Sequence, residues 1–245
     1  MTSLVTDTRV VFSRELRPVV RDPFSVIFSM IQPLFFLGLF APLLPGDESL
    51  QWFVPGIIVM SCLFGSSMTG SNLLYEIQTG SHERMLVTPL RRPALLIGRA
   101  LKEIVPMLAQ AVLIVVVCIP FGFELHLGGA LLGVAILAGF CIGLGALSYT
   151  LALASKNKEW LFWTVQQTLL FPLLLLAGVL LPLDNGPGWL KTLSKINPMT
   201  YVVDAERALF NGDVWTRQTL AGLIAAALVG ALGLTVGVRA MQRSD

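Results

Sequence analysis

Six long apolar stretches dominate the hydrophobic pattern of this 245-residue chain. A helix of about 20 apolar residues crosses the roughly 30 Å hydrocarbon core of a bilayer. Windows of this length lie at about residues 24–44, 53–74, 104–122, 129–154, 160–181 and 220–238. The pattern therefore predicts an all-α, polytopic membrane protein with six transmembrane helices, which form one domain over residues 1–245.

Residues 1–23, ahead of the first window, form an amphipathic segment. Polar positions recur every four residues, at Arg9, Ser13, Arg17 and Arg21. The apolar positions lie on the opposite side, at Phe12, Leu16, Val19 and Val20. We interpret this segment as an interfacial helix on the cytoplasmic leaflet, which Pro18 kinks or divides. A disordered basic tail fits the regular apolar face less well.

Residues 75–103 form the longest charged interruption in the first two-thirds of the chain, with five of its seventeen Lys and Arg residues. Ser81 suits the N-cap of a short helix, and Glu83 falls in its first turn, where the helix dipole favours negative charge. Pro89 ends that helix after about two turns, and Pro93 suits the start of a second helix. The segment is either a docking helix with Glu83 and Arg84 exposed or a solvated loop.

Composition and charge set the protein class and its orientation. With 55% hydrophobic and 13% charged residues and a mean hydropathy of +0.76, the chain is not a soluble globule. Six windows place the two termini and two of the loops on one side of the membrane, and these segments hold thirteen of the seventeen Lys and Arg residues. The other four lie in one long loop on the opposite, outer side. The positive-inside rule therefore places both termini in the cytoplasm.

The long outer loop, residues 182–219, carries two short amphipathic patterns. The apolar face of the first is Trp189, Leu190, Leu193 and Ile196, and that of the second is Tyr201, Val202, Ala205, Ala208 and Leu209. Asn197-Pro198 separates the two, and Gly212 suits the C-terminal stop of the second. Because such helices are too short to span, we expect them to be re-entrant in the outer leaflet. The alternative is an exposed helical hairpin.

Polar side chains gather in the inner halves of four predicted spans, whereas the outer halves are almost wholly apolar. The candidates for a substrate pathway are Gln32, Ser66, Ser67, Asn72, Gln110, Gln166 and Gln167. Because polar groups that face lipid are costly, we expect these residues to line a vestibule that opens to the cytoplasm and is closed outside by an apolar plug. Each of them could instead bond between helices as a packing residue.

Small residues repeat at four-residue spacing in the fourth and sixth windows and indicate close helix packing. They are Gly129, Gly133, Ala135, Gly139 and Gly143 in the fourth window, and Gly222, Ala226 and Gly230 in the sixth. We expect them to be structural.

Several motifs that would indicate an ATPase, an enzyme or a metal-binding protein are missing from the sequence. The six windows contain no Asp, Glu, Lys, Arg or His, and the chain has no G-x-x-x-x-G-K-[ST] phosphate loop. Its three cysteines fall inside windows, so neither a disulfide nor a metal site is expected. His82 and His126 fall on opposite sides of the membrane, which argues against a catalytic site. A transport pathway without its own energy source implies an energy-supplying partner.

Two stretches together resemble a known family: WFVPGIIVMSCLFGSSMTGSNLLYEIQTGSHERMLVTPLRRPALLIGR at 52–99 and LPLDNGPGWLKTLSKINPMTYVVDAERALFNG at 181–212. They are similar to the type-2 permease subunits of ATP-binding-cassette exporters, and most similar to the daunorubicin-type drug-resistance permeases. The resemblance covers essentially the whole chain. It implies a homodimer or heterodimer of permeases in the bacterial cell (inner) membrane, with a separate ATPase subunit docked on each. ATP and Mg would bind that ATPase, and this chain would bind no cofactor and no nucleic acid.

The resemblance also implies roles for residues of this chain. The interfacial elbow maps to residues 6–21 and the coupling helix to residues 81–89. The implied coupling residues are Ser81, His82, Glu83, Arg84, Met85, Thr88 and Pro89. The cargo would be a hydrophobic or amphipathic drug, or a lipid-like molecule, which the family recognises by cavity surface rather than by a motif.

Two other classes of function stay open at this stage. A secondary transporter coupled to sodium would depend on an ion gradient rather than on ATP. A non-transporting anchoring or assembly subunit would copurify with no ATPase. The fold alone does not separate these classes.

Overall fold

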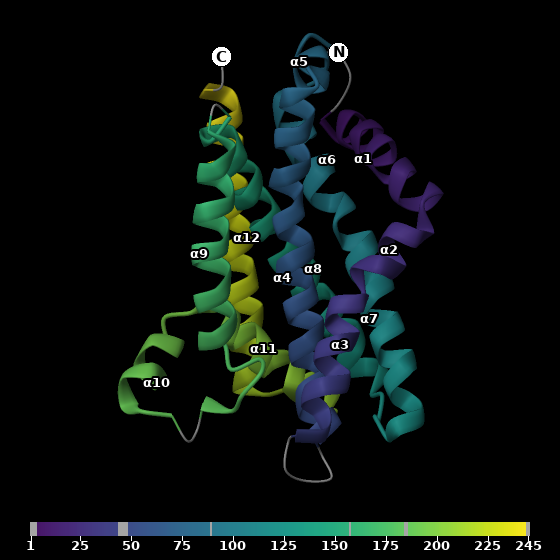
Figure 1. Ribbon diagram of the computed structural model, residues 1–245, viewed down its shortest axis with the longest axis vertical. Helices are drawn as coiled ribbons and strands as arrows, with labels where there is room; N and C mark the ends of the chain where they lie inside the picture. Colours follow the sequence, from purple (N-terminus) through teal and green to yellow (C-terminus); the bar gives the residue numbers. More distant parts are fainter. Residues whose placement is uncertain (1–3, 44–48, 89, 157, 184–185, 244–245) are drawn as a thin grey trace.

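Helices make up the regular secondary structure of the computed structural model, which describes residues 4–43, 49–88, 90–156, 158–183 and 186–243 (Figure 1). The first half comprises α1 (Leu4–Arg21), α2 (Pro23–Ser29), α3 (Ile31–Phe40), η1 (Ala41–Leu43), α4 (Ser49–Gln78), α5 (Ser81–Leu86), α6 (Arg92–Lys102), α7 (Ile104–Cys118) and η2 (Ile119–Phe121). The second half comprises α8 (Leu127–Ala154), α9 (Glu159–Leu176), α10 (Gly188–Ser194), α11 (Pro198–Phe210) and α12 (Arg217–Arg243). The prediction of an all-α protein is confirmed over these ranges.

Four of the helical segments described are long and apolar enough to cross a bilayer: Leu50–Gln78, Arg92–Phe121, Leu127–Ala154 and Arg217–Arg243. They correspond to the second, third, fourth and sixth predicted windows. The third begins at Arg92, so the charged residues Arg99, Lys102 and Glu103, which the predicted window left outside, belong to the same long helical segment. The window predicted near residues 160–181 corresponds to α9, which is not among these four segments. Gln166 and Gln167 lower the mean hydropathy of this helix.

The first predicted window is not one continuous helix. It breaks at Met30 between α2 and α3, and its shorter apolar helical part covers Ile27–Leu43. Pro33 lies in the first turn of α3, where proline costs no helical hydrogen bond because the first N–H groups of a helix have no partner within it, so its position agrees with a helix start just after Met30. The expectation of a single uninterrupted span at residues 24–44 is therefore wrong in this respect.

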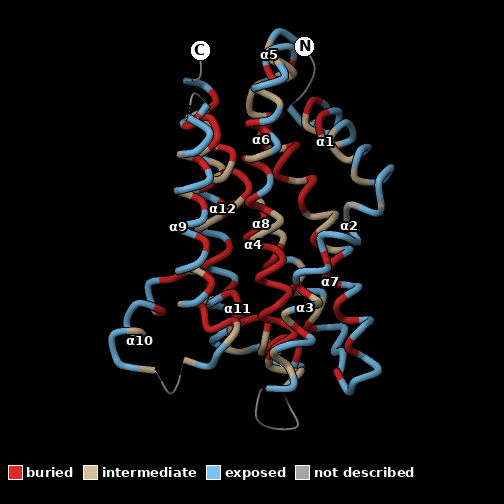
Figure 2. Tube along the Cα trace, viewed as in Figure 1, coloured by how far each residue is buried: buried red, intermediate tan, exposed pale blue. Residues whose placement is uncertain are grey.

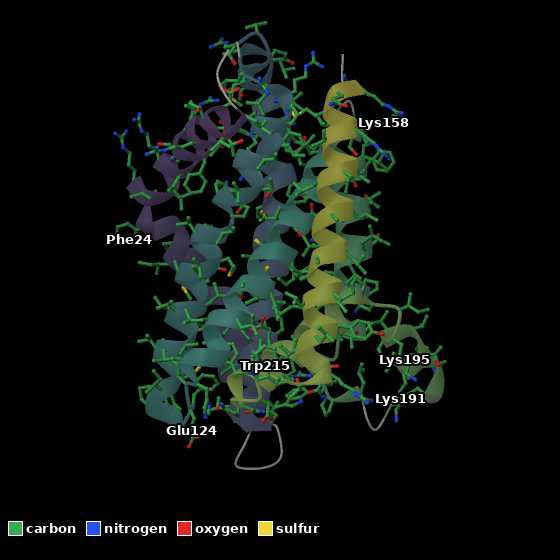
Figure 3. The ribbon with its side chains drawn as sticks, turned by 180° about the vertical axis from the view of Figure 1, so that it is seen from behind. Phe24, Glu124, Lys158, Lys191, Lys195 and Trp215 are labelled. Carbon is green, nitrogen blue, oxygen red and sulfur yellow. The ribbon has the colours of Figure 1, made fainter. Side chains whose placement is uncertain are left out.

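Both chain ends lie at the same end of the molecule as α5, and α10 and α11 lie at the opposite end (Figure 1). Lys158 lies at the first of these ends, whereas Lys191 and Lys195 lie at the second (Figure 3). The loops that the sequence assigned to opposite sides of a membrane are thus separated in space as expected.

The core lies where α4, α8, α11 and α12 meet, and its buried residues run through the middle of the molecule (Figure 2). Gly143 and Gly233 bring the backbones of α8 and α12 together, and Gly129 faces the backbone of Leu209 in α11. Gly222 of α12 likewise packs on α11 at Tyr201 and Ala205. A side chain at these positions would collide with a neighbouring helix, so the prediction of close packing is confirmed for Gly129, Gly143 and Gly222. It is not confirmed for Ala135, which is exposed, or for Gly139, where an added methyl group would have no atom of a neighbouring helix closer than 3.9 Å.

The N-terminal helix α1 is one element, and Pro18 does not divide it. Its side toward the protein is centred on Asp7 and Val11, and Val11 packs directly on Gly98 of α6. The predicted polar positions of the helix are exposed, as is the predicted apolar residue Val20. The helix therefore lies across α6 with its arginines exposed.

Candidate functional site

The short helix α5 projects at the end of the molecule that carries both termini (Figure 1). Gly80, with a φ of 67°, caps its N-terminus in the left-handed conformation, and Ser81 is the first helical residue. The expected Ser81 cap is therefore wrong. Glycine suits this sharp turn out of α4 because the turn requires positive φ.

Glu83 and Arg84 of α5 are exposed, whereas His82 and Met85 are buried beneath them. The Thr88 hydroxyl donates to the Met85 carbonyl at 2.6 Å and closes the end of the helix. Pro89 lies outside the described residues. The implied coupling residues thus divide into an exposed charged tip and a buried base.

The buried base makes α5 a firm projection. Met85 belongs to an apolar cluster with Val11, Leu73, Leu95 and Tyr149, which come from four other helices. Burial, and then the positive charge of Arg99, lowers the pKa of His82 to about 4, and the charge of Glu83 offsets this only in part. At neutral pH His82 is therefore uncharged, and the charge of α5 lies at its tip.

Behind α5, Arg99 of α6 joins four helices. Its side chain is 4% exposed and pairs with Glu76 of α4 and, at 3.5 Å from Nε, with Glu15 of α1. Its Nη1 donates to the Tyr149 hydroxyl of α8 at 3.2 Å, and that hydroxyl donates to the Met241 sulfur of α12 at 3.6 Å. We call Arg99, Glu15, Glu76 and Tyr149 the Arg99 cluster. It joins α1, α4, α6 and α8 at the end of the molecule that carries α5.

The sequence analysis missed the Arg99 cluster because it counted Arg99 only as a loop charge. Within α6, Arg99 follows Leu95 by four residues and Leu96 by three, so it lies on the apolar face of that helix. A charge on an apolar helix face is the signal that could have identified it, since such a charge needs a partner.

Two predicted pathway residues meet at one small cavity of about 170 Å³. Ser66 of α4 and Gln110 of α7 line it, together with Ser29, Ser61 and Glu103. The Gln110 amide donates to the Ser29 hydroxyl at 2.6 Å, and the Thr69 hydroxyl donates to Glu103 at 3.1 Å. This cavity, whose surface is mainly apolar, has room for a few waters but not for a drug-sized molecule.

The other predicted pathway residues do not join this cavity. Ser67 and Gln166 are buried elsewhere, and the Ser67 hydroxyl donates to the Leu63 carbonyl at 2.7 Å. Gln32, Asn72 and Gln167 are exposed. In a single copy of the chain the seven residues therefore do not form one vestibule.

At the opposite end, the two predicted short helices are present as α10 and α11. Asn197 caps α11, its side chain accepting from the Met199 N–H at 3.0 Å, and Gly212 follows the helix with a φ of 90°. Arg207 donates to the Trp52 and Gly178 carbonyls at 3.0 and 2.8 Å, and its guanidinium lies 3.7 Å from the Trp52 ring centroid. Arg207 thus fastens α11 to the N-terminal end of α4 and to the chain after α9.

Glu206 of α11 is a second charged residue that the sequence analysis missed. It is fully buried, its carboxyl packs on Gly133 of α8, and neither oxygen has a hydrogen-bond partner among the described residues. An unpaired carboxylate is costly in such surroundings, so the neutral acid is the form that this position favours. Glu206 follows Val202 by four residues, so it lies on the same buried face of α11. That spacing is the signal by which the sequence could have identified it.

Comparisons with known proteins agree on a single family. The model of the family described as "ABC-2 type transporter" matches residues 6–211. The chain is 26% identical to the "Daunorubicin resistance ABC transporter permease protein DrrB1" of Streptomyces coeruleorubidus over 78% of this chain and 70% of that protein. It is 30% identical to the transport permease ycf38 of Cyanophora paradoxa, over 80% and 71% of the two chains. It is 24% identical to a Mycobacterium tuberculosis protein named as the doxorubicin resistance permease DrrC, over 96% and 84%.

The match covers most of the chain, including three of the four long apolar helical segments, the charged projection α5 and the Arg99 cluster, and it ends before α12. The chain has no phosphate loop, which agrees with a transport subunit that hydrolyses no ATP itself. The chain therefore belongs to the ABC-2 type transporter family, as a membrane permease subunit of an ABC transporter in which a separate ATPase subunit hydrolyses ATP.

Proposed function

We propose that this permease exports a hydrophobic or amphipathic substrate, a drug or a lipid-like molecule, from a bacterial cell across its inner membrane. Two copies, or this chain and a similar one, form the transport pathway between them. Six spans cross the membrane, with α2–α3 and α9 as the two beyond the four long helices, and both termini lie in the cytoplasm. ATP and Mg²⁺ bind the partner ATPase.

The observation that carries this proposal is a set of exposed amides on otherwise apolar helices. Asn72 lies on α4 in line with exposed Met68 and Tyr75, and Gln167 lies on α9 in line with exposed Thr164 and Phe171. Amides that face lipid are costly. These two exposed rows of residues, on α4 and on α9, are therefore better placed against water and a second permease than against the bilayer. Because each row combines polar and apolar side chains, it suits an amphipathic cargo. The names of the drug-resistance relatives point to the same class of substrate.

A matched pair of glutamines tests this pathway. Gln110→Leu removes the partly buried hydrogen bond to Ser29 and should lower stability, on the order of 0.6 kcal/mol and at most about 1.7. Gln167→Leu should leave stability unchanged, because its amide is exposed, and should shift export toward more apolar compounds. Thermal unfolding and export of a panel of fluorescent dyes graded by polarity measure the two effects. An unchanged dye profile for Gln167→Leu, with lost stability, would assign Gln167 to packing instead.

We also propose that α5 docks on the ATPase through Glu83 and Arg84. This assignment is supported by the exposed tip, the buried base and the position of α5 beyond the ends of α4 and α6. A partner that grips this projection would move the Arg99 cluster behind it, and with it α1, α4 and α8.

The double variant Glu83→Ala/Arg84→Ala should reach the membrane and lower transport per ATP hydrolysed. A rim contact contributes little, whereas a desolvated charge pair costs about 2–5 kcal/mol when it is broken. Lys158→Ala removes an exposed charge from the loop between α8 and α9 at the same end and is the matched control. ATPase activity and dye transport in proteoliposomes measure the coupling. Wild-type coupling in the double variant would exclude a docking role for this tip.

Finally, we propose that α10 and α11 enter the outer leaflet and cover the external end of the pathway. Trp189, Leu193 and Ile196 of the α10 segment expose their side chains, and such an apolar face is favourable in lipid but not in water. Because α11 is buried against α8 and fastened by Arg207, it is the fixed part of this cover.

A further inference from the structure

An open apolar groove of about 590 Å³ runs between α1 and the consecutive helices α6 and α7. Its walls are Leu4, Val5 and Phe12 on one side and Ile97, Leu101 and Val105 on the other. The volume falls within the range of about 300–1,000 Å³ that is typical of pockets for small molecules. The groove lies apart from the exposed amides and from α5.

One charged residue, Arg9, lines this apolar groove. Its side chain is exposed and has no ion pair or hydrogen bond among the described residues. The acidic residues nearest to it in the helix are already engaged on the inner side of α1. Asp7 accepts from the Arg91 backbone N–H at 3.3 Å, and Glu15 pairs with Arg99. The positive charge at the groove is therefore unopposed by its own helix.

The place of the groove in the fold indicates what meets it. It opens beside α1, an amphipathic helix at the α5 end of the molecule, and continues along the start of α7, which belongs to a membrane-spanning segment (Figure 1). An amphipathic helix of this kind lies at the boundary between headgroups and acyl chains. At that depth an apolar wall meets acyl chains, and an arginine meets lipid phosphates.

We propose that this groove is a binding site for an anionic phospholipid of the leaflet on the α5 side, with an acyl chain against the apolar walls and the phosphate on Arg9. Arginine suits phosphate because its planar guanidinium donates two parallel hydrogen bonds. The site is independent of the exported cargo and of the direction of export. It couples the position of α1, and through Glu15 the Arg99 cluster, to the lipid composition of the membrane.

Native mass spectrometry of the purified permease–ATPase complex, titrated with phosphatidylglycerol or phosphatidylcholine, tests the site. The wild-type complex should retain phosphatidylglycerol in preference to phosphatidylcholine. Arg9→Gln should weaken phosphatidylglycerol binding about tenfold, as expected for the loss of a charge-assisted hydrogen bond. Arg17→Gln, on the same helix but away from the groove, is the matched control and should bind as the wild type does.

A second pair of variants tests the apolar part of the site. Val5→Trp places a bulky ring in the groove and should abolish retention of both lipids, whereas Val10→Trp, on another side of α1, should not. Val5 and Val10 are 77% and 53% exposed, so neither variant disturbs the core.

Two results would overturn the proposal. Equal retention of the two lipids by the wild type, unchanged by Arg9→Gln, would mean that bulk lipid fills the groove without selection. A disulfide between two copies that each carry Val5→Cys, with the three native cysteines replaced, would mean that a second permease covers it.

Discussion

Replacing Arg99 by methionine is expected to lower the stability of the permease by about 3–5 kcal/mol, the cost of removing one partner of a buried ion pair. The variant leaves Glu15 and Glu76 without their cation and Tyr149 without its donor. Because these groups come from three helices, α1 should detach from α6 before the remaining helices separate. Thermal unfolding of the purified protein, together with limited proteolysis after α1, measures both effects.

Arg91→Met is the control for this experiment. Arg91 is exposed, and its contact with Asp7 is made by its backbone N–H, which the substitution keeps. Its effect should stay within about 0.5 kcal/mol, as for most surface substitutions. Equal melting temperatures for the Arg99 and Arg91 variants would show that the Arg99 cluster does not hold the helices together.

A second large effect is expected at the contact between α8 and α12. In Gly143→Ala the new methyl group would lie 2.5 Å from the Val229 carbonyl oxygen and 2.7 Å from the Gly230 nitrogen. Backbone atoms cannot turn aside as a side chain can, so the helices must separate, at a cost of about 1–3 kcal/mol. Thermal unfolding in detergent should show a clear drop in the melting temperature.

Gly139→Ala makes the same chemical change on the same helix, with the nearest atom, the Ala226 methyl, at an ordinary 3.9 Å. It should leave stability unchanged or raise it by up to about 1 kcal/mol, because alanine favours helix more than glycine does. If the two variants shifted the melting temperature alike, the contact between the two backbones would not limit stability.

The sequence predicted those parts of the fold that depend on local pattern. The length of the apolar windows located the four long spans. The two amphipathic patterns, separated at Asn197 and ended by Gly212, located α10 and α11. The break at Met30 was missed because the apolar run continues through it, and only Pro33 indicated that a helix starts there. Hydropathy measures transfer into lipid and does not register where a helix is interrupted.

The candidate site was predicted less completely than the fold. The exposed pair Glu83 and Arg84 followed from the charge pattern, although the N-cap of their helix was misplaced by one residue, whereas Arg99 and Glu206 were missed. A charge is recognised as buried only when its neighbours in space are known, and those neighbours lie far away in the chain. For the same reason, the polar residues of the spans could be grouped by depth but not by direction. That is why Gln110 and Gln167 turned out to have different surroundings.

The glycine contacts also determine which parts of the molecule can move relative to one another. Where two backbones touch, sliding or rotation meets rigid atoms at once, so α8, α11 and α12 are expected to travel as one body during a transport cycle. Helix α9 is held differently: the Gln78 amide donates to Glu159 at 2.8 Å at one end, and the Asn197 amide donates to the Leu173 carbonyl at 2.7 Å at the other. Side-chain bonds of this kind can re-form at a new angle. The tilt of α9, the helix that carries Gln167, is therefore expected to change more readily than the packing of α8, α11 and α12.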